Sequence, residues 1–452
     1  MDFSPSPLKS VRLSLRLAVL MLLLFAWSGC GDTFRPIAIP IPPVPPNPAG
    51  FHDVFVLSNN GASDAGSSFS IDVSGDTEVG VATLGIAPVH AAITPNLSRI
   101  YVANSGEDSV SSYAPQSFTA VTTISLPLGS KPVFVGTTEN ATAYVANAGN
   151  NTVSVISVAS NVVSKTLNVG NNPIALTETP DAKHVYVLNQ GDGSVSVIST
   201  ADDTAAGTIP VGGSPVWAVA RFDSEQVYVL DSATGNISVI NANTQTVTPQ
   251  TTQISAGPGA NYMFYDQHLN RLYVVNPTAR QVPVFDVSGN LPVALPTIDL
   301  GAGVSPPCPA GCVVASVTAL LDGTRAYVVS YQESGTCAVT TDVPPCVSTN
   351  VTVVSTTGNN IIKTMNVDPG GTGEVTAVAA CDAVRFRRFI AASADTTRVF
   401  VSNCDAGDAA VVRTSDDSHL LDLKAPGGIL PPTAPPGAQP PPQNPVFILV
   451  GS

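Results

Sequence analysis

The chain has 452 residues, of which 33 are acidic and 19 basic, so it carries a formal net charge of −14 at pH 7. An acidic surface of this kind repels phosphate backbones, and we expect no nucleic-acid partner. The length and the 44% of hydrophobic residues allow a core far larger than a marginal domain needs.

The first 29 residues have the pattern of an export signal. Lys9, Arg12 and Arg16 precede an apolar stretch at 17–25, which is too short to span a bilayer with these flanks. Small residues then lead to Cys30, and this pattern resembles the lipobox of bacterial lipoproteins, in which the cysteine is acylated. We predict a signal peptide at 1–29 and lipidation of Cys30, with ordinary secretion as the alternative. The membrane is then contacted through the lipid anchor only.

A proline-rich segment follows at 30–50. Its seven prolines between positions 36 and 48 favour an extended polyproline conformation, so we expect a stalk between the anchor and the rest of the chain. The predicted location is the bacterial cell envelope, on the outer membrane or facing the periplasm. Which membrane carries the anchor, and whether the protein is exposed at the cell surface, stays open.

From residue 51 on, one tetrapeptide strand returns at a nearly constant spacing. Tyr-Val-Ala-Asn or a close variant occurs at 101–104, 144–147, 186–189, 228–231 and 273–276. Looser copies lie at 54–57, 327–330 and 399–402. Steps of 42 to 45 residues between the regular copies are typical of propeller blades built from short strands.

Each repeat contains four strand-like pieces. In the unit that begins at Tyr144, an alternating run at 153–156 and a third run at 162–169 are followed by a Gly-x-x-Pro corner from Gly170 to Pro173. Alternation with period 2 predicts strands. Glycine adopts the positive φ that lets the chain leave a sheet, and proline is tolerated at the first residue of a strand. The corner therefore marks the passage to the next blade.

The two ends of the repeat array are expected to meet. The first copy lacks an upstream strand, and the apolar run at 446–450 can supply it, which would remove both exposed sheet edges. We predict an all-β fold, a single β-propeller over 51–452 with eight four-stranded antiparallel blades closed by the C-terminal strand. Seven blades is the alternative. The proline-rich stretch at 426–445 is expected to form a surface loop before the closing strand.

The tetrapeptide, the alternating strand and the corner together resemble the YVTN family of β-propeller repeats, which occurs in bacterial and archaeal surface or periplasmic proteins. The match covers roughly residues 53–450 and is most regular at 89–284. This resemblance relates the chain to lactonase-like propellers and to many propellers with no assigned activity. A shared fold does not fix the function.

Besides Cys30, six cysteines lie in the last third of the chain. They occur as close pairs, which predicts disulfides in an exported protein. We expect these disulfides to pin long insertions in the irregular repeats. A metal or redox site is the rival interpretation, but no histidine lies within ten residues of any of the six. The expected pairs are Cys308 with Cys312, Cys337 with Cys346, and Cys381 with Cys404.

Candidate site residues are few. His90 lies two residues after a corner proline, where sister repeats have Phe134 and Trp217, and we expect all three at the central channel. A packing role for His90 is favoured over a ligand role. The turns after the tetrapeptides offer oxygens that Ca²⁺ could use, but the same residues are good turn formers. We expect no other cofactor, and we assign no catalytic residue because the sequence lacks nucleophile-elbow, zinc-helix and phosphate-loop motifs.

Two main functions remain open. The first is a non-catalytic, envelope-anchored scaffold that binds a protein or glycan partner, and repetition without a singular polar cluster favours it over an enzyme. The alternative, implied by the family resemblance, is a lactonase-like hydrolase with a site at the channel mouth. An enzyme site must break the repeat with unique polar residues at that entrance. Redox chemistry with a quinone or haem is a third possibility, without a ligand motif. The oligomeric state stays open.

Overall fold

The computed structural model describes residues 53–61, 63–115, 121–138, 141–250, 253–303, 305–337, 345–369, 373–424 and 443–450. The expected signal peptide, Cys30, the stalk and residues 425–442 of the second proline-rich segment lie outside them. Within the described residues, no helix has the length and apolar character needed to cross a membrane.

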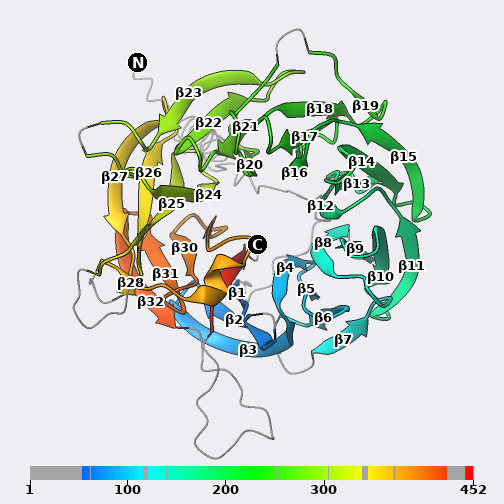
Figure 1. Ribbon diagram of the computed structural model, residues 1–452, viewed down its shortest axis with the longest axis horizontal. Coiled ribbons are helices and arrows are strands. Elements are labelled where there is room, and N and C mark those ends of the chain that lie inside the picture. The colour runs from blue at the N-terminus through cyan, green and yellow to red at the C-terminus, as the bar shows by residue number, and fades with distance from the viewer. Residues whose placement is uncertain are drawn as a thin grey trace, which may run out of the picture. The chain divides into compact units, whose positions relative to one another are not determined.

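The described strands form eight antiparallel sheets arranged in a ring (Figure 1). This confirms the predicted eight-bladed β-propeller and rules out the seven-bladed alternative. In blades 2 to 8 the strands run in chain order, with the first strand of each blade nearest the centre of the ring and the last at the rim.

Blades 1 to 4 each consist of four strands. Blade 1 consists of β1 (Asp53–Ser58), β2 (Ala65–Asp72), β3 (Thr77–Ile86) and the C-terminal β33 (Pro445–Val450). Blade 2 consists of β4 (Pro88–Ile93), β5 (Ile100–Asn104), β6 (Ser109–Tyr113) and β7 (Thr122–Ser125). Blade 3 consists of β8 (Pro132–Thr138), β9 (Thr142–Asn147), β10 (Thr152–Ser157) and β11 (Val162–Asn168). Blade 4 consists of β12 (Pro173–Glu178), β13 (His184–Asn189), β14 (Ser194–Ser199) and β15 (Thr204–Pro210).

Blades 5, 6 and 8 also consist of four strands, and blade 7 has one additional strand. Blade 5 consists of β16 (Pro215–Ala220), β17 (Gln226–Asp231), β18 (Ile237–Asn241) and β19 (Thr246–Val247). Blade 6 consists of β20 (Tyr262–Asp266), β21 (Arg271–Val275), β22 (Gln281–Asp286) and β23 (Val293–Asp299). Blade 7 consists of β24 (Cys312–Ala319), β25 (Arg325–Ser334), β26 (Cys346–Ser355) and β27 (Asn360–Asn366), with β28 (Val375–Thr376) paired to β26. Blade 8 consists of β29 (Arg388–Ala392), β30 (Arg398–Asn403), β31 (Asp408–Arg413) and β32 (Ser418–Lys424).

The repeated tyrosine is buried in the second strand of its blade, and in three blades its hydroxyl reaches the next blade. There it donates to an Asn or Asp side chain in the turn between the third and fourth strands. Each acceptor residue has a positive φ, which Asn and Asp tolerate better than most residues. The pairs are Tyr101 with Asn161 (2.8 Å), Tyr144 with Asp203 (2.5 Å) and Tyr327 with Asp417 (2.6 Å).

The asparagine that ends the tetrapeptide ties the second strand to the third. The buried Asn147 Nδ2 donates to Thr152 Oγ1 at 3.0 Å and to Ser154 Oγ at 2.9 Å. Blades 2 and 4 repeat this contact through Asn104 and Asn189. The hydroxyls that alternate with apolar residues along the third strand therefore accept hydrogen bonds from a buried amide nitrogen.

The turns after the tetrapeptides hold the corners between blades. Asp108 accepts hydrogen bonds from the backbone N–H groups of Gly129 at 2.7 Å and Lys131 at 2.9 Å. Asn151 accepts in the same way from Asn172 at 2.9 Å. Two of the side chains considered above as calcium ligands, Asp108 and Asn151, thus accept from the backbone of a neighbouring corner.

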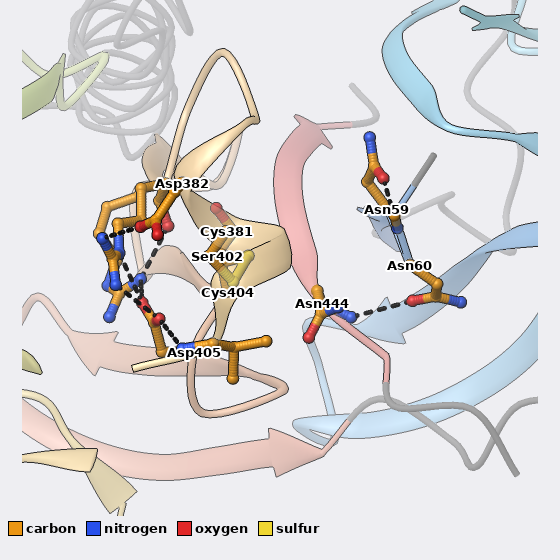
Figure 2. Close-up of a disulfide and its surroundings, with 12 residues drawn as sticks. Asn59, Asn60, Cys381, Asp382, Ser402, Cys404, Asp405 and Asn444 are labelled. Carbon is orange, nitrogen blue, oxygen red and sulfur yellow. Dashed lines mark hydrogen bonds and ion pairs between the residues drawn. A yellow bond between two sulfur atoms is a disulfide. The ribbon is translucent and has the colours of Figure 1, made fainter. Parts of the chain in front are cut away.

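The ring is closed as predicted by pairing of β33 with β1, in which Val56 faces Ile448. Asn444 reinforces the closure, because its N–H donates to Asn60 Oδ1 at 3.2 Å, as Figure 2 shows. The register corrects one detail of the sequence alignment. Phe400 pairs with Val411 as Tyr144 pairs with Val155, so the repeat copy near the C-terminus begins at Phe400, one residue later than Val399.

Three disulfides join the cysteine pairs that their spacing predicts, all in blades 7 and 8 or just before them. They connect Cys308 with Cys312, Cys337 with Cys346, and Cys381 with Cys404.

Candidate functional site

Aromatic side chains from the innermost strands meet around the centre of the ring. His90, Phe134 and Trp217 come from β4, β8 and β16, and in each strand the register shifts between the corner proline and this residue. The His90 and Phe134 rings are stacked with centroids 3.6 Å apart, and Phe134 meets Trp217 edge-on at 5.8 Å. The three residues that the sequence places at the channel therefore lie in one row.

His90 has the surroundings of a packing residue. It is buried between Phe134 and Phe447, and its Nδ1 accepts a weak hydrogen bond from the Val135 N–H at 3.5 Å. Burial, together with the positive charge of Arg385, lowers the pKa of His90 to about 3. The imidazole is therefore neutral at physiological pH and cannot exchange protons there.

An insertion before β29 extends into the centre of the ring, and we call residues 377–387 the strap. It contains the helical turn η2 (Ala379–Asp382), which Figure 1 places toward the middle of the ring. Near its end, Phe386 is buried against three aromatic rings of the inner strands. The centroid distances are 5.8 Å to Trp217, 5.6 Å to Tyr262 and 4.9 Å to Phe389.

Arg385 connects the strap to blades 4 and 5 on the opposite side of the ring. Its Nη1 donates to the Ile174 carbonyl of blade 4 at 3.0 Å, and its Nη2 donates to the Val216 carbonyl of blade 5 at 2.9 Å. The guanidinium lies 4.8 Å from the Trp217 ring and 5.8 Å from the Phe134 ring. Residue 175, between these two rings in the order of blades, is alanine. The guanidinium of Arg385 thus lies between the Phe134 and Trp217 rings, where blade 4 contributes only the small side chain of Ala175.

The base of the strap is fixed by a disulfide and a buried carboxylate, both shown in Figure 2. Cys381 is bonded to Cys404, and the adjacent Asp405 accepts from the Val378 N–H at 2.8 Å. Asp405 also receives Arg387 Nη2 at 2.8 Å and Arg388 Nη1 at 2.7 Å. Burial opposes ionisation, but these two arginines keep the pKa of Asp405 below its usual value.

Two further carboxylates reach solvent beside this cluster. Asp382 Oδ1 lies 2.7 Å from Arg387 Nη1, and Glu333 Oε2 lies 3.3 Å from the same nitrogen. Their side chains are 64% and 46% exposed, whereas Arg387 is 7% exposed. One buried guanidinium therefore orients two accessible carboxylates at the boundary between blades 7 and 8.

Behind them lies a buried group of polar atoms without hydrogen-bond partners in the described structure. It includes both carboxylate oxygens of Asp408, Asp368 Oδ1, Arg388 Nη2 and the side-chain amide of Asn403. Burial and the nearby Asp422 carboxylate raise the pKa of Asp408 to about 7, although Arg388 partly offsets this effect. Burial likewise raises the pKa of Asp368.

The strap was not identified from the sequence. Its signal is a concentration of charge, since Arg385, Arg387 and Arg388 fall within four positions of a chain with only 19 basic residues. The paired cysteines around it predicted pinned insertions, which favour an interaction surface over an enzyme site. Among the described residues, the one group with metal-binding spacing is Cys337, Cys346 and Glu374, and its sulfurs form a disulfide, which leaves no thiolate ligand.

No protein-family model matches the chain, and no curated protein matches it. Solved structures resemble it over most of its length. The dihydro-haem d1 dehydrogenase NirN, in complex with DHE, has a TM-score of 0.61 at 11% identity, covering 82% of this chain and 72% of its own. The periplasmic gluconolactonase PpgL of Pseudomonas aeruginosa has a TM-score of 0.53 at 14% identity, covering 88% and 98%. A Lactobacillus plantarum protein has a TM-score of 0.51 at 13% identity, covering 88% and 99%. At these identities the similarity establishes the fold alone, which is that of a β-propeller.

Proposed function

We propose that the chain is a lactonase-like hydrolase whose site lies at the centre of the ring, beside the strap. The observation that carries this proposal is the break in the repeat. The strap places Arg385 over the Trp217 ring, and Arg387 at its end pairs with the carboxylates of Asp382 and Glu333. Among the described residues, arginines lie over aromatic rings only in the strap and at the adjacent Arg388. Unique polar groups at the centre of a symmetric scaffold are the pattern that an enzyme site requires.

The chemistry follows from these groups. Hydrolysis of a cyclic ester begins when water attacks the carbonyl carbon, and the carboxylate of Asp382 or Glu333 accepts the proton of that water. Negative charge then develops on the carbonyl oxygen, where the guanidinium of Arg385 stabilises it. The ring C–O bond breaks, and the proton passes from the carboxylic acid to the leaving alkoxide. The product is a hydroxy acid.

Similarity to a gluconolactonase fold adds support, although it concerns architecture alone. The scaffold hypothesis rested on repetition without a singular polar cluster, and the strap is such a cluster. We therefore favour the hydrolase, which was the alternative from the sequence. Membership of the YVTN repeat family and an envelope location with an acylated Cys30 remain part of the proposal. The three disulfides support export, because such bonds persist in oxidising compartments.

The test is hydrolysis of a panel of γ- and δ-lactones by the purified full chain, followed by acid release at constant pH and corrected for spontaneous opening. We expect turnover of at least one lactone. The double variant Asp382→Asn/Glu333→Gln should lose a factor of about a hundred or more. Asp416→Asn is the matched control, because Asp416 is also an exposed partner of an arginine but lies on the β31–β32 turn. No turnover with any lactone, or equal rates in all variants, would contradict the proposal.

A further inference from the structure

We infer that Arg385 forms a binding site for a small organic carboxylate at the centre of the ring. The inference goes beyond hydrolysis, since it concerns recognition of an anion and holds for ligands that cannot be hydrolysed. If the hydrolase proposal is right, the hydroxy acid product belongs to the same chemical class.

The first argument is charge. Arg385 makes hydrogen bonds to two backbone carbonyls and has no carboxylate partner among the described residues. Most arginines of the described structure form ion pairs with carboxylates. These are Arg221, Arg325, Arg387, Arg388, Arg398 and Arg413. Carbonyl dipoles orient the guanidinium but do not neutralise it, so a full positive charge is left for a ligand.

The second argument is accessibility. Arg385 is an exposed residue, although protein surrounds it on several sides. These surroundings lower the pKa of Arg385 to about 10, so the side chain stays cationic at neutral pH. Each carbonyl takes one N–H from a terminal nitrogen, which leaves three of the five guanidinium N–H groups for a ligand.

The third argument is the apolar frame of the cation. The rings of Phe134, Trp217 and Phe386 lie 5.8 Å, 4.8 Å and 5.8 Å from the guanidinium carbon. A ligand that reaches the cation must come close to these rings, which favours an anion with an apolar body over a strongly hydrated inorganic ion. Charge-assisted hydrogen bonds then bind its carboxylate.

The fourth argument is preorganisation. The Cys381–Cys404 disulfide and the Asp405 cluster hold the base of the strap, while packing of Phe386 holds its tip. Little conformational freedom is left for a ligand to restrict, so the net free energy of binding is more favourable. The net charge of the chain is −14, which repels anions at long range, and recognition must therefore depend on these short-range contacts.

Fluorescence of Trp217 provides a direct test. The chain has two tryptophans, and replacing the other in a Trp27→Phe variant of the full chain makes Trp217 the single reporter, 4.8 Å from the cation. The probe is cyclohexanecarboxylate, with cyclohexylmethanol and inorganic phosphate as comparisons at constant ionic strength. We expect a saturable change with cyclohexanecarboxylate at a Kd of about 1 mM or below. We expect weaker binding of the alcohol and of phosphate.

Variants separate recognition from general charge effects. Arg385→Gln should weaken carboxylate binding by a factor of about ten or more. Arg413→Gln removes the same charge at the far end of β31 and should leave binding unchanged. Binding that is absent in the parent, equal in Arg385→Gln, or as tight for the alcohol or phosphate would overturn the inference. Because the probe is not a lactone, a chain that binds it without opening lactones would refute the hydrolase and leave the carboxylate site standing.

Discussion

Blades 3 and 8 solve the same packing problem with different chemistry. In blade 3, side-chain hydrogen bonds without an ion pair join the strands and the next blade, through Asn147 with Thr152 and through Tyr144 with Asp203. In blade 8, Asn403 and Asp408 occupy the positions of Asn147 and Thr152. The side chains of Asn403 and Asp408 have no hydrogen-bond partner among the described residues. Blade 8 relies on buried ion pairs and a disulfide instead. Blade 3 is thus joined by repeated hydrogen bonds, while blade 8 uses buried ion pairs and a disulfide that also hold the strap.

The interface between blades 8 and 1 also replaces a hydrogen bond of the repeat by an ion pair. Phe400 has no hydroxyl to offer blade 1, and Arg398 of the same strand forms a bidentate ion pair with Asp76 there. Asp76 lies in the turn between the third and fourth strands counted from the centre of its blade, as Asp203 does, and both have positive φ. Where the repeat loses the tyrosine hydrogen bond, an ion pair joins the same two positions.

The largest effect should come from the buried ion pairs of blade 8. Asp405→Asn leaves Arg387 and Arg388 without their shared carboxylate inside the protein, and we expect a loss of about 3 to 5 kcal/mol in the free energy of unfolding. Chemical denaturation measures it. The exposed pair of Arg413 with Asp416 is the control, and Asp416→Asn should change little. Similar losses in both variants would refute the distinction between buried and exposed pairs.

The disulfide of the strap should come next. The disulfide closes a loop of 23 residues. Replacing Cys381 and Cys404 by serine frees this loop in the unfolded chain, and the gain in chain entropy should lower the free energy of unfolding by about 3 kcal/mol. The Cys308–Cys312 pair closes only four residues, so its serine variant should lose less, about 2 kcal/mol. Thermal unfolding of the two variants checks the order, and the reverse order would contradict it.

Asp408 should give a pH-dependent effect. Its pKa of about 7 in the folded protein exceeds that of an unfolded aspartate, so the folded state retains a proton that the unfolded state has released. The protein should therefore lose stability as pH rises from about 4 to 7. Asp408→Ser restores the hydroxyl of the regular blades and should stabilise the protein by about 2 kcal/mol at pH 8.

Thr152→Asp is the matched control for this effect, because it introduces the carboxylate of blade 8 into blade 3. Unfolding measured from pH 4 to 9 should become more pH-dependent in this variant and less so in Asp408→Ser. Parallel profiles for both variants and the parent would show that Asp408 does not titrate in this range.

The smallest effect should come from a single tyrosine hydroxyl. Tyr144→Phe removes the hydrogen bond to Asp203 and should lower the free energy of unfolding by about 1 kcal/mol. Tyr186→Phe removes a buried hydroxyl that has no partner and should be neutral or slightly stabilising. A larger loss in Tyr186→Phe than in Tyr144→Phe, measured by denaturation, would contradict the role of the interblade bond.

The fold was predictable because the same pattern of strands and corners recurs in most blades. Tyr144 and its sister residues mark the second strands, Pro173 marks a blade boundary, and both follow from local physics of strands and corners. The site was not predictable, because the strap appears once and departs from the repeat. Its contacts join Arg385 to Ile174, which lies 211 residues earlier, and no local pattern encodes such a distance. His90 could be placed at the centre, since it occupies a repeated position.

The most direct test of the account compares lactone opening by two disulfide variants. One replaces Cys381 and Cys404 by serine, and the other replaces Cys308 and Cys312, at a temperature where both are folded. If the strap forms the site, the first variant should lose most of its activity and the second should keep the parent rate. Equal rates in the two variants, or a loss confined to the second, would contradict the account.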